Sequence, residues 1–226
     1  MADLTYVAGL DLGQARDFTA LAILERTRPD DPSPSEEETF RVHQTWSGIE
    51  TIPVRPAAAK RERTYALRHL ERFPLGTSYP AICARIVEMF QEPPLAGTRL
   101  VVDQTGVGRA VVDMIRRARP QATICPITIT AGHAAVPDGA GWHVPKKELV
   151  SVLQVLLQSR RLQVARGLPL APVLVKELQA FQVKITANAQ ESFAAWRERD
   201  HDDLVLSVAL AAWVGEHAMK EFRMWC

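Results

Sequence analysis

Short blocks of apolar residues predict strands in the first part of the chain and amphipathic helices later. Residues 6–13 form an apolar strand that delivers Asp11 to its carboxyl end and turns at Gly13. A second apolar run over residues 18–24 follows closely enough to pair with it as a hairpin. Residues 40–46 alternate loosely in polarity and predict a third strand with one solvated face. The chain should therefore begin with a three-stranded antiparallel meander.

The middle of the chain changes from strand to helix and back. A helix capped by Ser78 comes first, followed by an apolar strand over residues 99–103 that closes on Asp103. The helix that begins at about Val107 has a clear core-facing stripe, and residues 122–129 form the next strand. Strand, helix and strand in this order predict a parallel, right-handed crossover.

The last third of the chain predicts mostly helix. Residues 202–217 are apolar nearly all round, so this final helix should be buried. The elements before it are interpreted as a loop or small hairpin over residues 130–145, a helix from Lys146, a strand over 162–164, a helix from about Leu170, and a second hairpin that pairs 183–186 with 192–196. The whole pattern predicts one α/β domain over residues 1–226. Its mixed sheet would have an antiparallel meander followed by parallel strands, with flanking helices.

Composition changes this picture only by exclusion. The formal net charge is +1, so the protein is not a generally basic coat for nucleic acid, and a polyanion would have to be held by local patches. There are three cysteines, without metal-ligand spacing, which fits a reducing cytoplasm better than a disulfide framework. Neither a secretion signal nor an apolar run long enough to span a membrane is present. We therefore expect a cytoplasmic protein with no membrane partner.

Acidic residues stand at the ends of two predicted strands and at the start of the last helix. Asp11, Asp103 and the pair Asp202 and Asp203 could each be an ordinary turn or helix-cap residue. Together they can converge on one edge of the sheet, where open α/β sheets bind ligands. Clustered carboxylates repel one another unless a cation neutralises them, and hard oxygen ligands favour Mg²⁺ or Mn²⁺ over zinc.

Two such ions about 3.5–4 Å apart could activate water and stabilise the leaving oxygen in phosphodiester hydrolysis. We expect Asp11, on the central strand, to bridge both ions, while Asp103 holds one and Asp203 the other. The accessory candidates, each with an ordinary alternative, are Asp17 (a turn acid), Asp202 (a helix cap) and His201 (a solvated loop histidine).

An ordered set of short motifs runs through nearly the whole chain. Its members are GLDLG at residues 9–13 with Asp17, VDQTGVG at 102–108, VPKKEL at 144–149, EL at 177–178 and HDDLV at 201–205. In this set the chain resembles the nuclease domain of phage large terminase subunits, within the ribonuclease-H-like superfamily. The resemblance implies a mixed sheet of five or more strands and metal-dependent cutting of double-stranded DNA during viral genome packaging. It also implies metal ligands at Asp11, Asp103 and Asp203, with an accessory role for Asp17.

One departure from that family concerns the motor. Large terminases carry an ATPase ahead of this domain, whereas this sequence has no GxxxxGK[ST] motif. The chain would then be a separated nuclease module, an excised domain or a stand-alone relative. A separate ATPase motor, portal or small terminase subunit is a candidate partner.

Contacts to DNA phosphates should come from local basic residues and carry little sequence information. Lys146 and Lys147, at a predicted helix start, are the leading candidates. Lys60, Arg61 and Arg63 come next, although a solvated loop explains that cluster equally well.

Three other functions stay open at the level of sequence. The first is another ribonuclease-H-like nuclease, such as a junction resolvase or an RNA–DNA hybrid nuclease. The second is an actin-like ATP-binding domain, for which 226 residues leave little room. The third is a non-catalytic DNA-binding or assembly module with a degenerate site.

Overall fold

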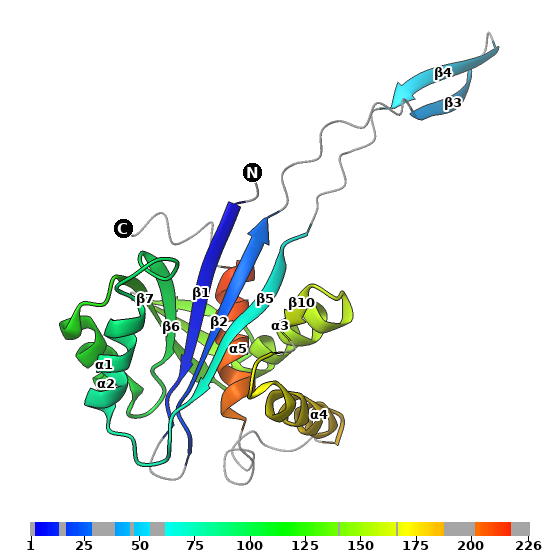
Figure 1. The fold of residues 1–226 in the computed structure, drawn as a ribbon. Coiled ribbons are helices and arrows are strands. Elements are labelled where there is room, and N and C mark those ends of the chain that lie inside the picture. Colours follow the sequence, from blue (N-terminus) through cyan, green and yellow to red (C-terminus); the bar gives the residue numbers. More distant parts are fainter. Residues whose placement is uncertain are drawn as a thin grey trace.

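The structure of the protein is a computed structural model that describes residues 3–13, 17–28, 39–45, 48–54, 62–139, 141–165, 167–187 and 202–217. Side chains are described in these stretches except at residues 3–4, 28, 39–45, 48–54 and 181–187. Within these limits the chain builds a mixed sheet covered by helices on both faces (Figure 1). No described helix combines the length and apolar character that a bilayer crossing requires.

The main sheet of the described chain has eight strands in the order β10-β5-β2-β1-β6-β7-β9-β8. β1 pairs antiparallel with β2, which pairs antiparallel with β5. β1, β6, β7 and β9 run parallel in succession, and β10 is parallel to β5. Most strands therefore end at one edge of the sheet, called here the carboxyl edge. The strands are β1 Asp3–Asp11, β2 Ala20–Arg28, β5 Thr64–Arg72, β6 Thr98–Asp103, β7 Ala122–Thr130, β8 Val136–Asp138, β9 Gly141–Pro145 and β10 Leu162–Val164.

Helices cover the sheet in two groups, as Figure 1 shows. Strand side chains alternate between the faces, so the central strands β1, β2 and β6 each contribute to two separate cores. One core lies under α1 and α2, and the other lies under α3, α4 and α5. As the sequence predicted, α5 is buried along nearly its whole length. The helices are α1 Tyr79–Met89, α2 Gly108–Ala118, α3 Lys146–Gln158, α4 Ala171–Ala187 and α5 Asp203–His217.

The third strand of the meander is not the predicted one. A strand does form here, β3 Thr39–Thr45, close to the predicted residues 40–46. It does not join the main sheet, however, but pairs with β4 Gly48–Val54 in a separate two-stranded sheet. The strand beside β2 is β5, which the predicted meander did not include. β5 occupies this position because its apolar side chains are buried against the helices. The mixed sheet itself is confirmed.

The predicted second hairpin is also wrong where the structure describes it. Residues 183–186 belong to the last turns of α4 and do not form a strand. Their β-branched residues favour a strand only weakly, and the helix that precedes them simply continues. The partner segment, residues 192–196, lies outside the described residues.

α5 approaches β1 closely at Gly9. A Cβ added to Gly9 would lie 2.0 Å from the backbone carbonyl oxygen of Ser207 and 2.9 Å from the backbone nitrogen of Ala211. Only glycine leaves room for this approach, because both obstacles are backbone atoms of a buried helix. Gly9 thus sets the height of α5 above the central strand.

We predict that Gly9→Ala lowers the free energy of unfolding by about 1–3 kcal/mol or more, because α5 must move away from β1. Urea denaturation monitored by circular dichroism measures this change. Gly167→Ala is the matched control, since a Cβ there meets no atom within 4 Å. Equal stability of the Gly9→Ala variant and the parent would contradict the tight packing.

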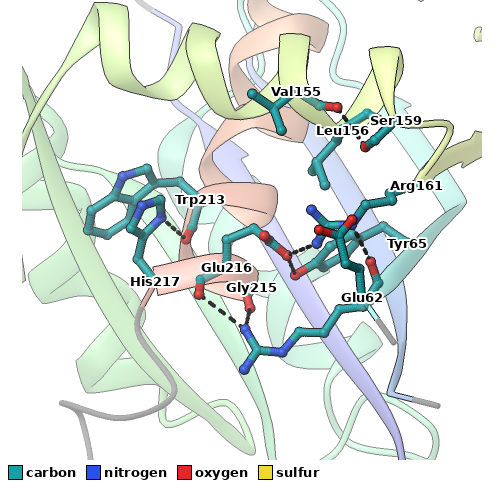
Figure 2. Close-up of polar contacts among 11 residues, drawn as sticks. Glu62, Tyr65, Val155, Leu156, Ser159, Arg161, Trp213, Gly215, Glu216 and His217 are labelled. Carbon is teal, nitrogen blue, oxygen red and sulfur yellow. Dashed lines mark hydrogen bonds and ion pairs between the residues drawn. The ribbon is translucent and has the colours of Figure 1, made fainter. Parts of the chain in front are cut away.

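The C-terminal end of α5 is tied to the sheet by a polar network (Figure 2). The Glu216 Oε1 atom accepts hydrogen bonds from Arg161 Nη2 at 2.7 Å and from the Tyr65 hydroxyl at 2.6 Å. Arg63 Nη1 donates to the backbone carbonyls of Gly215 and Glu216, which belong to the last turn of the helix. Burial raises the pKa of Glu216, but the hydrogen bonds and neighbouring guanidinium charges outweigh it and leave the pKa below its usual value.

A depressed carboxyl pKa stabilises the fold above the unfolded-state pKa, about 4.3, and this stabilisation disappears as the pH falls through the folded-state value. We predict that Glu216→Gln costs about 1–3 kcal/mol at pH 7 and that the gap to the parent narrows below about pH 4. Denaturant titrations between pH 3 and pH 7 measure both quantities. Glu88→Gln, at an exposed position of α1, is the control. A gap for Glu216→Gln that does not change with pH would contradict the prediction.

Candidate metal centre

Neighbouring strands place two acids and one arginine side by side at the carboxyl edge. β1 and β6 are parallel and end on Asp11 and Asp103. Asp11 also lies opposite Ala20 of β2, and Ala20 lies opposite Arg72, the last residue of β5. The order across the sheet is therefore Arg72, Ala20, Asp11 and Asp103.

The side chains of Asp11, Asp103 and Arg72 should all lie on the face covered by α5, because residues two apart in a strand share a face. Asp11, Asp103 and Arg72 each follow by two positions a residue that packs on that face. Those preceding residues are Gly9, Val101 and Leu70. Asp11 and Asp103 are both 8% exposed, so their carboxylates are largely removed from water.

The helices on this face add three more acids. Asp203 is the first residue of α5 and is buried, and Asp202 caps the helix by accepting a hydrogen bond from Leu206 N at its backbone carbonyl. Glu177 comes from α4 and is also buried. Acids are favourable at a helix N-terminus, which helps to explain Asp202 and Asp203 but not Glu177.

Basic and polar side chains hold several of these acids. Arg72 Nε donates to Asp203 Oδ2 at 2.7 Å, and Arg72 Nη2 pairs with Glu177 Oε1. Lys146 Nζ donates to Asp202 Oδ2 at 2.8 Å. Asp103 Oδ1 accepts hydrogen bonds from the backbone N–H of Thr105, at 2.8 Å, and from the Thr105 hydroxyl.

The electrostatics of the cluster show an excess of negative charge. Burial raises the pKa of Asp11 well above its usual value, and the charges of Asp103, Asp202 and Asp203 raise it further, while Lys146 lowers it. Burial, followed by the charge of Asp203, also raises the pKa of Glu177 to about 7, although Arg72 opposes this shift. The basic side chains therefore do not fully balance the acids.

The donor set fits a hard divalent cation such as Mg²⁺ or Mn²⁺, because it consists of carboxylate oxygens. As they stand, the described residues include no group of three or more acidic, histidine or cysteine side chains arranged to hold an ion. Three of the acids are turned to basic partners instead, Asp203 and Glu177 to Arg72 and Asp202 to Lys146. Asp11, Asp103 and Asp203 would be the ligands once Asp203 is shared with an ion.

The other predicted site residues are placed differently. Asp17 is exposed in the loop between β1 and β2, and Lys147 lies 3.1 Å from His133 Nδ1 at an exposed position. Arg63 binds the opposite end of α5 from Asp203. Lys60, Arg61 and His201 lie outside the described residues. The DNA contacts expected of the basic residues stay predictions.

Sequence reasoning missed Arg72 altogether. Arg72 lies in none of the predicted strands or helices, and its partners are 105 and 131 residues away in the chain. Glu177 was noted only within a motif of the resemblance. Pairing β5 with β2 would have shown that Arg72, the last residue of β5, lies at the same edge of the sheet as Asp11.

Comparisons with known proteins find likeness in structure only. No protein-family model and no curated protein sequence matches the chain. The large terminase nuclease from thermophilic phage G20c is 18% identical, with a TM-score of 0.52 over 95% of this chain and 83% of that chain. The human cytomegalovirus terminase nuclease domain, soaked with Mn and bound to an inhibitor, is 14% identical, with a TM-score of 0.51 over 95% of this chain and 84% of that chain. The chain has the terminase nuclease fold. The expected ribonuclease-H-like architecture is thereby confirmed.

We predict that Asp11→Asn stabilises the metal-free protein, because the neutral amide removes a buried charge that three other aspartates repel. The gain at pH 8 in EDTA should be about 1 kcal/mol or more, since each unit of raised pKa corresponds to about 1.4 kcal/mol. Thermal and urea denaturation measure it. Asp113→Asn, on the exposed side of α2, is the control and should change little. A destabilised Asp11→Asn variant would contradict the repulsion.

Proposed function

We propose that the chain is a Mg²⁺- or Mn²⁺-dependent endonuclease that cuts double-stranded DNA, as in viral genome packaging. The observation that carries the proposal is the convergence of Asp11, Asp103 and Asp203 at the carboxyl edge of a terminase nuclease fold. A separate ATPase motor, portal or small terminase subunit would be its partner.

The residues divide the work according to their positions. Asp11, on the central strand between Asp103 and the start of α5, would share two ions, while Asp103 and Asp203 would each hold one. Bound ions would activate the attacking water and stabilise the leaving oxygen in phosphodiester hydrolysis. Thr105 orients Asp103 through two hydrogen bonds, and Lys146 places a positive charge at the rim where a DNA phosphate would approach.

The test is cleavage of supercoiled plasmid by the purified protein with Mg²⁺, with Mn²⁺ and with EDTA. We expect nicking or linearisation that requires the metal. Asp11→Asn, Asp103→Asn and Asp203→Asn should each reduce the rate by about a hundredfold or more, because each removes a ligand charge from the centre. Asp113→Asn should cut like the parent.

Two further results separate this proposal from its alternatives. Parallel substrates, namely linear duplex, a four-way junction and an RNA–DNA hybrid, should show duplex DNA as the preferred one. Preference for the junction or the hybrid would indicate another ribonuclease-H-like nuclease. Metal binding without cleavage of any substrate would indicate a non-catalytic module and would refute the proposal.

A further inference from the structure

Arg72 contacts three residues at the candidate metal centre. Its guanidinium donates to Asp203 and pairs with Glu177, and it lies 4.8 Å from the centre of the Phe18 ring. The Arg72 side chain is only 16% exposed, so these contacts are largely shielded from water. Neither the proposed hydrolysis nor the proposed ligand set gives Arg72 a role.

The planar fork of arginine suits this position for a geometric reason. It can bind two carboxylates from different helices with separate nitrogens, which a lysine ammonium does with less directional control. Arg72 thereby connects β5 to the first residue of α5 and to α4 at once. The orientation of the Asp203 carboxylate is then fixed from the sheet as well as from its own helix.

The same contact opposes a bound cation. A guanidinium hydrogen-bonded to Asp203 Oδ2 partly neutralises that carboxylate and repels a divalent ion that uses it. An ion held by Asp203 should therefore bind more weakly than it would if Arg72 were absent.

We propose that Arg72 is a positioning residue of the metal centre, which aligns Asp203 for catalysis at the expense of affinity for the ion that Asp203 holds. The inference rests on the proposed metal-dependent cleavage. It assigns opposite effects to the loss of Arg72: metal binding becomes tighter and catalysis becomes slower. If Arg72 had a purely structural role, its loss would weaken both metal binding and catalysis or leave both unchanged.

The test compares Arg72→Gln and Arg72→Lys with the parent in two measurements. The first is the Kd for Mn²⁺ alone, without DNA, measured by calorimetry on metal-free protein. The second is kcat for plasmid cleavage at saturating Mn²⁺. In Arg72→Gln we expect one Mn²⁺ site to bind about fivefold more tightly, because the repelling charge is gone. Its kcat should fall about tenfold or more, because Asp203 is no longer held in place.

Arg72→Lys separates charge from geometry. It retains the positive charge, so its Kd for Mn²⁺ should stay close to that of the parent, while the loss of the fork should lower kcat to an intermediate value. It also keeps the test meaningful if Arg72→Gln folds poorly. Melting temperatures in EDTA identify any such loss of folding.

Arg161→Gln is the matched control. Arg161 also joins α5 to the sheet through a carboxylate, Glu216, and its side chain is 11% exposed, but it lies at the opposite end of the helix. This variant should lower the melting temperature and leave both Kd and kcat of the folded protein unchanged. Changes in both quantities similar to those of Arg72→Gln would overturn the inference.

Other outcomes are equally decisive. If Arg72→Gln cuts DNA at the parental rate, or loses Mn²⁺ affinity, Arg72 does not have the proposed role. A parent protein that neither binds Mn²⁺ nor cuts DNA would refute the proposed function, and this inference would fall with it. A parent that binds and cuts, with an Arg72→Gln variant that behaves identically, would refute only the role of Arg72.

Discussion

The close approach of α5 to β1 at Gly9 is the constraint on which the candidate site depends. Asp11 follows Gly9 by two residues on the same strand, and Asp203 begins the turn of α5 that leads to Ser207. The contact between Gly9 and Ser207 therefore sets the distance between the two acids. A larger side chain at position 9 would move the whole helix, because the obstacle is its backbone. The position of the site is thus determined by the packing of Gly9 against α5 at Ser207, one helical turn after Asp203.

That packing brings like charges together, and the fold compensates for this only in part. Arg72 and Lys146 each pair with acids at the start of α5 or in α4, yet the pKa of Asp11 is still raised by burial and by its acidic neighbours. Burying charge without a partner opposes folding. The metal-free protein therefore carries an electrostatic cost at one edge of its sheet, while the rest of the described core is mainly apolar. A bound cation would relieve that cost.

The sequence was informative wherever structure is set by local pattern. Asp11 and Asp103 could be placed at one edge of the sheet because apolar strands end on them, and Asp203 could be placed there because a buried helix begins at it. The partner of a strand is not local information, so β3 was placed where β5 belongs. The same limit hid Arg72, whose contacts require β5, α4 and α5 to be assembled first. A β-branched stretch at the end of α4 was likewise misread as a strand because its helical context comes from the residues before it.

The fold alone does not decide between a nuclease and a degenerate relative, because folds host many functions and the structural neighbours are 18% and 14% identical. The electrostatic balance of the site bears on this choice more directly. In a non-catalytic module, replacing one buried acid by a neutral residue would stabilise the fold at no cost in function. This chain instead has a buried acid cluster, with arginine and lysine side chains that orient two of the acids. A cation bound at the site would explain why the chain keeps this local instability. Places where a chain departs from its most stable arrangement are typical of functional sites.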